Sequence, residues 1–292
     1  MKYIDLHVHS DASDGTMNPS ELAEHAKEQG LSAFALTDHD CIYGDAETWQ
    51  EAEKRGLGFL PGMELTALFH GRKIHVVCLG MDAENPGSRQ IYRKLRANKE
   101  AKIAEIVEYV KNQGIDISVE KVEPYGFGRP LDRYSIMRYM VSLHMYDRAQ
   151  PIWDNYLNPA VQALGLNAVV SIEDALPVIH EAGGVSSLAH YHKQIGLKGL
   201  TREEQKRAIL ELHDMGLDGM ERWYPNYTKE DAEFAAHMID EYRLLATAGT
   251  DFHGGNRPEV KLGKGLEDHL MISYELFERI ADHVEKCLKP RK

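Results

Sequence analysis

The sequence predicts an α/β protein whose parallel sheet closes into a barrel or near-barrel and carries a helical insertion. Apolar stretches of strand length alternate with amphipathic stretches of helix length near both ends of the chain. This alternation is typical of a parallel sheet covered by helices. About seven strand-like stretches favour a barrel. Between residues 85 and 167 long polar helical stretches replace the alternation, so we expect an inserted helical domain there.

The first part of the chain contains two predicted helices and four predicted strands. The helix at 18–30 has Asn18 as a cap, Pro19 at its first position and Gly30 as a stop signal. A second helix is expected at 43–56. Apolar runs predict strands at residues 2–8, 32–40, 57–67 and 72–81.

The remaining elements complete the predicted domain organisation. Within the insertion, helices are expected at 88–114 and 133–145. The alternation then resumes, with helices expected at 171–183, 201–216, 228–243 and 273–289 and strands at 184–190, 217–224 and 244–254. We therefore expect a catalytic barrel of residues 1–84 and 168–292, with residues 85–167 as a helical lid over the substrate.

Composition narrows the class of protein. The 292 residues carry a net charge of −12 with no basic block, so no duplex nucleic acid is expected as a partner. The cysteines, Cys41, Cys78 and Cys287, show no paired spacing, which argues for a reducing compartment. No apolar leader and no run of about 18 apolar residues occurs. We expect a cytoplasmic protein with no membrane partner.

Polar side chains that can bind metal ions end most of the predicted barrel strands. His7 and His9 are two apart, so on a strand they point to the same side. The carboxyl ends of parallel strands share one rim, where distant residues converge. His75 fits less well, because it lies near the start of its predicted strand. The set has six histidines and three acids: His7, His9, Asp14, His39, Glu64, His75, His190, Asp251 and His253.

This set predicts a metal centre. A single histidine at a strand end is usually a structural residue, but six of them among three carboxylates favour ligands. The mixed nitrogen and oxygen donors suit Zn, Mn or Fe, and the imidazoles argue against Mg or Ca as the main ions. Nine ligands exceed the need of one ion, so two or three ions are expected. Glu64, with two oxygens, is a natural bridge.

Five sequence features stand out together: the opening D-x-H-x-H-S, "TDHD", "GMEL", the later His190 and "GTDFHG". Jointly they resemble the motifs of the polymerase and histidinol phosphatase (PHP) family of metal-dependent phosphoesterases. The resemblance covers about residues 2–83 and 168–267. "GMERWYPNYTKED" is similar to a further family segment, and "GRPLDRYSIMRYMV" resembles the G-R-P-H-I-A segment of the subgroup with a helical insertion. Leu131 replaces the histidine of that segment.

The resemblance implies a fold, a ligand assignment and a substrate class. The fold is a distorted (β/α)7 barrel with a trinuclear centre. The subgroup is similar to phosphatases that remove the 3′-phosphate from nucleoside 3′,5′-bisphosphates, and related members trim short 5′-phosphorylated RNA from its 5′ end. The implied ligands are His7, His9, Glu64 and Asp251 for one ion, Glu64, His75 and His190 for the second, and Asp14, His39 and His253 for the third.

The chemistry expected of such a centre needs no protein nucleophile. Bound cations neutralise phosphoryl oxygens and lower the pKa of a bridging water to about 7, so that hydroxide attacks the phosphorus. Asp38 is a candidate catalytic residue that orients a histidine or moves a proton; the alternative is a capping carboxylate. His192 is a candidate for assisting the leaving group or contacting substrate.

Candidate substrate contacts lie both near the rim and in the insertion. Guanidinium groups bind phosphate through two hydrogen bonds, and aromatic rings stack on bases. The alternative for each tyrosine is ordinary packing, and Arg138 is left as a solvated helix residue. The candidates are Ser13, Arg129, Arg133, Tyr134, Lys193, Tyr224 and Tyr227.

The sequence therefore predicts a metal-dependent phosphoesterase that hydrolyses a phosphomonoester of a small nucleotide, such as AMP or a nucleoside bisphosphate. Three alternatives stay open. One is a histidinol-phosphate phosphatase, against which the "GRP" segment counts. Another is an inactive module that binds metal and nucleotide. A third is an amide or ester hydrolase, because a metal hydroxide also attacks carbonyl groups.

Overall fold

The computed structural model describes residues 2–42, 44–146, 148–166 and 169–288, with side chains to residue 284. The chain forms two compact units. The first comprises residues up to Tyr92 and from Val170 onward, and the second comprises Arg93–Val169. Residues 167 and 168, where we expected the second domain boundary, lie outside the described residues, as do Tyr43 and Lys289 at the ends of two predicted helices.

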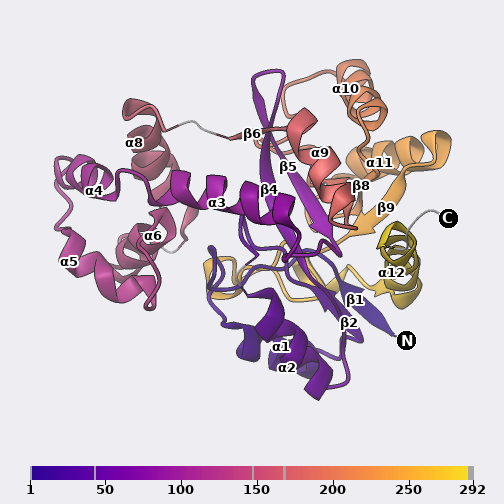
Figure 1. Ribbon diagram of the computed structural model, residues 1–292, viewed down its shortest axis with the longest axis horizontal. Coiled ribbons are helices and arrows are strands. Elements are labelled where there is room, and N and C mark those ends of the chain that lie inside the picture. The colour runs from indigo at the N-terminus through magenta and orange to yellow at the C-terminus, as the bar shows by residue number, and fades with distance from the viewer. Residues whose placement is uncertain (1, 43, 147, 167–168, 289–292) are drawn as a thin grey trace. The chain divides into compact units, whose positions relative to one another are not determined.

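The first unit contains two sheets (Figure 1). One has the strand order β10-β1-β2-β3 and the other the order β6-β4-β5-β7-β8-β9. The strands of the first are β1 (Tyr3–Asp5), β2 (Ala33–Ala35), β3 (Gly58–Leu60) and β10 (Ile272–Ser273). Those of the second are β4 (Gly62–Phe69), β5 (Arg72–Leu79), β6 (Val170–Ser171), β7 (Val185–Leu188), β8 (Gly219–Trp223) and β9 (Leu245–Ala248).

Two isolated bridges join the sheets just beyond the strand ends. Val8 pairs with Phe252, and His39 pairs with Glu64, both in parallel. The first bridge connects the chain after β1 with the chain after β9, and the second connects the chain after β2 with β4. Seven strands thus follow one another around a ring, in the order β1, β2, β4, β5, β7, β8 and β9. This is the distorted (β/α)7 barrel predicted from the sequence.

The expectation of a parallel sheet was wrong at β10, which pairs antiparallel with β1, and at β5. Strand β5 pairs antiparallel with β4 on one side and with β7 on the other. The predicted strand 57–67 is also interrupted at Pro61, which lacks the N–H needed for a ladder, so that β3 and β4 belong to different sheets. At the next position, a Cβ on Gly62 would lie 2.4 Å from the Cys78 carbonyl oxygen, so only glycine fits.

Helices cover the outside of the barrel in the positions predicted (Figure 1). The first has the Asn18 cap and Pro19 expected from the sequence, and Glu21 completes a capping box. Thr201 and Thr228 cap α10 and α11 in the same way. These helices are α1 (Pro19–Glu28), α2 (Asp45–Lys54), α9 (Ile172–Glu181), α10 (Arg202–Asp214), α11 (Lys229–Tyr242) and α12 (Tyr274–Leu288), with short 3₁₀ turns η3 (Gly254–Asn256) and η4 (Leu266–Asp268).

The second unit is helical. The single helix predicted at 88–114 is two helices, because Lys102 adopts φ +55° and ends the regular hydrogen bonding. The unit has its own apolar core, which includes Ile106, Ile136 and Met140. The helices are α3 (Pro86–Glu100, which begins in the first unit), α4 (Ile103–Lys111), α5 (Val119–Val122), α6 (Arg133–Ser142), α7 (Gln150–Ile152) and α8 (Asn158–Ala163), with turns η1 (Glu123–Gly126) and η2 (Trp153–Leu157).

Cys41 and Cys78 are buried and form no disulfide with a described residue, and the side chain of Cys287 lies outside the described residues. In the part of the chain that the structure describes, every helix is too short or too polar to cross a bilayer.

Candidate metal centre

The nine predicted ligands converge at one rim of the barrel. His7 and His9 follow β1, where the His9 N–H donates to the Phe252 carbonyl at 2.9 Å. Their rings are 5.2 Å apart and fully buried, while Val8 between them points into the apolar core. The two-residue spacing therefore places both imidazoles on the same side, as expected from a strand.

His75 reaches the same rim because β5 runs antiparallel to its neighbours. In an antiparallel strand the amino-terminal half lies beside the carboxyl end of the adjacent strand. The Ala189 N–H donates to the His75 carbonyl at 3.0 Å, which sets His75 beside His190 at the end of β7. The position of His75 early in its strand thus agrees with a place at the rim.

The first group of potential ligands contains His7, His9, Glu64 and Asp251, with one donor atom from each lying within 4.8 Å of the others. His9 Nε2 lies 3.1 Å from Asp251 Oδ1 and 3.3 Å from Glu64 Oε2. His7 Nε2 lies 3.3 Å from the same Glu64 oxygen. All four side chains are buried.

Glu64 lies between this first group and a second set of donors, His75 and His190. Its Oε1 atom is 2.7 Å from His190 Nε2 and 2.8 Å from His75 Nδ1, whereas its Oε2 atom is 2.9 Å from His39 Nδ1. The two oxygens of one carboxylate therefore face different sets of imidazoles. This is the geometry of a carboxylate that can bridge two ions.

The last group surrounds Asp14 and consists of His9, Asp14, His39 and His253. His253 Nε2 lies 3.2 Å from Asp14 Oδ1, and His39 Nε2 lies 3.7 Å from Asp14 Oδ2. The rings of His9 and His253 stack with centroids 4.1 Å apart. The structure thus brings the implied ligands of all three ions together, with two differences in grouping. His9 also belongs to the Asp14 group, and His39 forms a further group with Glu64 and His75.

Buried nitrogen and oxygen atoms that lack hydrogen-bond partners show that metal ions fit this cluster. Buried polar atoms in proteins nearly always have hydrogen-bond partners. Here several fully buried atoms form no hydrogen bond with any described residue: His7 Nε2, His9 Nδ1 and Nε2, Glu64 Oε2, His190 Nδ1, Asp251 Oδ1 and His253 Nε2. All belong to predicted ligands, and such atoms gain what they lack from a bound cation.

The protonation states of some predicted ligands suit metal binding. Burial raises the pKa of Glu64, but attraction by His75 and His39 outweighs it and holds the pKa well below the ordinary value. Burial lowers the pKa of His190 to about 3 and that of His253 to about 4. Ionised carboxylates and neutral imidazoles are the forms that coordinate metal ions.

His7 and His9, by contrast, must lose a proton to coordinate an ion. Burial lowers the pKa of both rings, but Glu64 and Asp251 outweigh it; they raise the pKa of His9 to about 9 and that of His7 well above its ordinary value.

Two of the predicted ligands have strained backbones. His190 adopts φ +25° and Asp251 adopts φ +55°, a region that residues with a Cβ rarely occupy. The His190 N–H donates to Glu221 Oε2 at 2.5 Å, which helps to hold this conformation. Such strain is concentrated at functional sites, where the surroundings stabilise it.

Two residues of the site were missed by sequence reasoning. Glu221 is buried in β8 and lies 2.7 Å from His7 Nδ1, the nitrogen that faces away from the cluster. A carboxylate in this position fixes the orientation of a ligand histidine. Arg257 lies 2.5 Å from Asp251 Oδ2. Glu221 is part of the segment "GMERWY", but it lies within the predicted strand, and the search for ligands considered residues at strand ends.

Asp38 and Ser13 form part of the support beneath the ligand loop. Asp38 accepts hydrogen bonds from the Ser10 N–H at 2.8 Å, the Ser10 hydroxyl at 2.6 Å and the Ser13 hydroxyl at 2.5 Å. Both Asp38 and Ser13 are buried. These contacts favour positioning of the loop that carries Asp14, the alternative considered for Asp38.

Four other predicted residues lie close together, and two of them contact Asp251. Lys193 Nζ lies 3.1 Å from Asp251 Oδ2, and the Tyr224 hydroxyl donates to the same oxygen at 2.5 Å. His192 contacts Asn226 at 2.9 Å, and its ring lies 4.9 Å from that of Tyr227. The Tyr227 hydroxyl donates to the Glu221 carbonyl at 3.0 Å. The structure thus brings this candidate group to the rim.

The predicted contacts in the insertion belong to the second unit. Tyr134 is buried in its core, packs edge-on against Trp153 and accepts a hydrogen bond from Lys99 at 2.6 Å. This is the packing role that sequence reasoning left as the alternative to stacking on a base. Arg129 and Arg133 are half-buried, and the Arg129 guanidinium lies over the exposed Phe127 ring at 5.9 Å.

The barrel and its buried nitrogen and oxygen cluster define a metal-dependent hydrolase. The family model described as the PHP domain matches residues 5–129. A Haemophilus influenzae protein named 5′-3′ exoribonuclease is 30% identical over 281 residues, which span 94% of this chain and 99% of that protein. The chain belongs to the PHP family and is a metal-dependent phosphoesterase, which confirms the resemblance and the general activity predicted from the sequence.

Other relatives support the same conclusion. A Chromobacterium violaceum protein named 3′,5′-nucleoside bisphosphate phosphatase is 29% identical, covering 87% of this chain and 88% of that protein. A structure from Bifidobacterium adolescentis, provisionally described as a metal-dependent phosphoesterase, aligns with a TM-score of 0.79 at 26% identity, covering 97% and 96% of the two chains. An amidohydrolase of Chromobacterium violaceum, solved with bound sulfate and no metal, aligns with a TM-score of 0.76 at 26% identity over 96% of both chains.

Proposed function

We propose that this protein removes the 3′-phosphate from nucleoside 3′,5′-bisphosphates. The observation that carries the proposal is the pairing of two cations, Lys193 and Arg257, with Asp251 at the edge of the metal cluster. The name of the Chromobacterium violaceum relative, which aligns over most of both chains, supports this substrate class. A bisphosphate needs one phosphate at the reacting centre and cationic groups for the other.

We propose that two or three Zn, Mn or Fe ions are held by the nine rim residues in the three groups described above. When bound there, such ions supply Lewis acidity and a hydroxide at neutral pH. The remaining tasks fall to the chain itself. Glu221 orients His7, and Asp38 holds the loop that presents Asp14.

Lys193 and Arg257 are placed to bind phosphoryl oxygens. Their side chains are 29% and 30% exposed, whereas Asp251 beside them is buried. Both contact Asp251 Oδ2, which leaves Oδ1 directed at His7 and His9. A guanidinium and an ammonium at this edge neutralise a dianion and hold it beside the ligands.

His192 and the tyrosines are proposed to orient the substrate. Burial lowers the pKa of His192, so its ring is neutral at pH 7 and suits hydrogen bonding better than proton donation. Tyr224 and Tyr227 lie with His192 in one aromatic group, with Tyr224 5.6 Å from each of the other two rings. Such a group offers flat surfaces beside the cationic edge.

The second unit is proposed to act as the substrate lid. Its "GRP" turn carries Arg129, and Arg133 begins α6 in the following segment. Both are proposed as contacts for the second phosphate. Leu131 stands where the similar family segment has a histidine, so any hydrogen bond from that position is lost in this chain.

A second candidate function is trimming of short 5′-phosphorylated RNA from the 5′ end. The name of the Haemophilus influenzae relative, which aligns at 30% identity over nearly its whole length, favours it. The two functions differ in the length of chain beyond the reacting phosphate. Both use the same metal cluster, so only substrate comparison separates them.

The test is phosphate or nucleotide release from a panel of substrates by the metal-loaded protein. The panel contains adenosine 3′,5′-bisphosphate, AMP, a 5′-phosphorylated trinucleotide and histidinol phosphate. The proposal predicts the highest kcat/KM for the bisphosphate, with AMP as product. Preferred release of mononucleotides from the trinucleotide would replace it with the second function, and preference for histidinol phosphate would reject both.

A further inference from the structure

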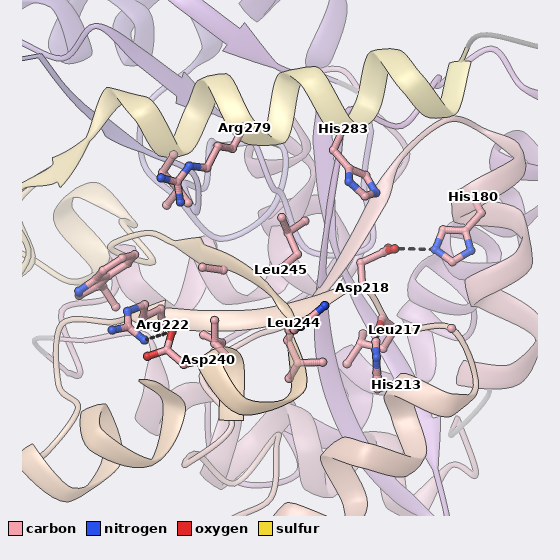
Figure 2. A pocket seen from close by; sticks show the side chains of 16 residues that line it. His180, His213, Leu217, Asp218, Arg222, Asp240, Leu244, Leu245, Arg279 and His283 are labelled. Carbon is pink, nitrogen blue, oxygen red and sulfur yellow. Dashed lines mark hydrogen bonds and ion pairs between the residues drawn. The ribbon is translucent and has the colours of Figure 1, made fainter. Parts of the chain in front are cut away.

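A pocket lies on the outside of the barrel and is lined by residues of β8, β9, α11 and α12, with His180 of α9 and His213 of α10 (Figure 2). Its volume is about 880 Å³, enough for a small organic ligand. No predicted metal ligand lines it. Its charged and titratable lining consists of Arg222, Arg243, Arg279, His180, His213, His283, Asp218 and Asp240.

The pocket lining carries more positive than negative charge, with three arginines and two aspartates. Asp218 is satisfied by His180 at 2.9 Å and by the Ser186 N–H at 2.8 Å. Neither Arg243 nor Arg279 forms an ion pair with any residue whose side chain the structure describes. Both side chains are exposed, and the exposed Glu275 lies one helical turn from Arg279 on α12. An excess of arginine over acids in one pocket is unexpected in a chain with a net charge of −12. This excess favours an anionic ligand.

One end of the pocket has the features of an anion site. Figure 2 shows Arg279 reaching from α12 and Arg222 from β8 toward the same end. Arg222 lies 3.5 Å from Asp240, and its buried Nη1 atom forms no hydrogen bond with a described residue. Asp240 is itself 73% exposed, so it compensates Arg222 only weakly. The Nη1 atom faces Asp240, so a phosphate oxygen would contact the accessible part of the Arg222 side chain, which is 25% exposed.

An extension with a mixed polar and apolar lining, which includes Glu275, lies next to this end. A further depression of about 380 Å³ shares Trp223, Leu276 and Arg279 with the pocket. It is also lined by Leu270 and by Met271, of which 58% is exposed. The Trp223 ring, 42% exposed, stands at the junction. A ligand with a phosphate at one end and a flat apolar group at the other matches this arrangement.

We propose that this pocket binds a nucleoside monophosphate at a site separate from the metal centre. Arg222 and Arg279 hold the phosphate through charge-assisted hydrogen bonds, Arg243 adds positive charge to the same lining, and the base lies beyond Trp223 against Met271. Arg222 follows Glu221 on β8, and successive residues of a strand face opposite sides. The pocket and the metal centre therefore lie on opposite faces of the same strand.

The test uses the metal-loaded protein and the fluorescence of Trp223. AMP and inorganic phosphate are titrated separately, and Trp223→Phe identifies the part of the signal that comes from the pocket. We expect AMP to give a saturable signal that Trp223→Phe removes. The double variant Arg243→Gln/Arg279→Gln should weaken the apparent affinity about tenfold or more, since each lost charged hydrogen bond is worth that much. Its kcat and KM for hydrolysis should stay unchanged.

The matched control is Arg207→Gln/Lys229→Gln, which removes two exposed positive charges outside the pocket. It should bind AMP as the wild type does. Asp251→Asn, which damages the metal centre, should also keep the Trp223 signal. Loss of the signal in Asp251→Asn, or its survival in the arginine double variant, would overturn the proposal. An equal affinity for inorganic phosphate would reject the nucleotide and leave a site for free phosphate.

Discussion

Two histidine–carboxylate pairs in the first unit have similar distances but different surroundings. His7 lies 2.7 Å from Glu221, and both side chains are almost completely buried. His180 lies 2.9 Å from Asp218, with exposures of 37% and 19% (Figure 2). Only the first histidine directs its other nitrogen into a cluster of unsatisfied donors. A buried carboxylate such as Glu221 can thus hold a predicted ligand histidine in one orientation. An exposed pair such as His180 and Asp218 forms an ion pair that solvent screens.

The largest effect is expected from removing the negative charge of a predicted metal ligand in the buried cluster around His7. In Asp251→Asn, loss of the carboxylate charge should abolish phosphate release and remove metal from the first ligand group, because an amide is a poorer ligand than a carboxylate. Phosphate release and elemental analysis measure the two effects. Asp240→Asn, which changes an exposed acid of the outer pocket, is the control and should keep full activity. Normal turnover by Asp251→Asn would refute the ligand assignment.

Changing the carboxylates that hold the two histidines should sharpen the contrast. Glu221→Gln should weaken metal affinity about 10- to 100-fold, because the partner of a ligand histidine sets its orientation and basicity. Asp218→Asn should leave metal affinity unchanged. Competition with a metal-binding dye measures both. Equal effects of the two substitutions would show that Glu221 has no special role at the metal centre.

Removing the cation beside Asp251 should have a moderate effect on substrate binding. Arg257→Gln should raise KM about tenfold, as expected for one lost charge-assisted hydrogen bond to a phosphate. The metal content should change little, since Arg257 contacts Asp251 through Oδ2 and leaves Oδ1 toward the histidines. Steady-state kinetics with the bisphosphate test this. An unchanged KM would remove Arg257 from the substrate site.

The smallest effect is expected at the exposed pair. The hydrogen bond to Asp218 raises the pKa of His180 above 6.5. Burial raises the pKa of Asp218, but hydrogen bonds from His180 and Ser186 outweigh this effect and hold the pKa of Asp218 below 3.8. The stabilisation linked to His180 is complete below pH 6.5 and disappears as pH rises through its raised pKa. That linked to Asp218 is complete above pH 3.8 and disappears as pH falls further.

His180→Gln should therefore lower the free energy of unfolding most between about pH 4 and 6.5. The loss should be about 0.5 kcal/mol, because more than a third of the His180 side chain is exposed and solvent screens the pair. Urea unfolding at several pH values measures it. A loss that persists unchanged at pH 9 would show that packing, and not the ion pair, is responsible.

The metal cluster was more predictable from sequence than the strand directions. Strand-end residues such as His9 and Asp251 converge because parallel strands share a rim, a rule that needs no coordinates. The reversal of β5 depends on long-range pairing with β4 and β7, which local propensity does not encode. Glu221 was missed for the same reason, since its inward direction depends on the placement of β8 against its neighbours.

The insertion shows a different limit. Its helical character follows from composition. The break at Lys102 requires a left-handed backbone at a lysine, and no glycine or proline near this position indicates a turn. The burial of Tyr134 likewise depends on packing against Trp153 from a distant segment. An exposed ring and a buried ring have the same local sequence signal, so the choice between stacking and packing needed the structure.

The central claim is that Glu64 joins two sets of imidazoles around bound metal ions. The most direct measurement is metal content per chain for wild type and Glu64→Gln, after circular dichroism shows that both are folded. We predict two or three ions in the wild type and at least one fewer in the variant. A folded Glu64→Gln protein with the metal content and turnover of the wild type would contradict it.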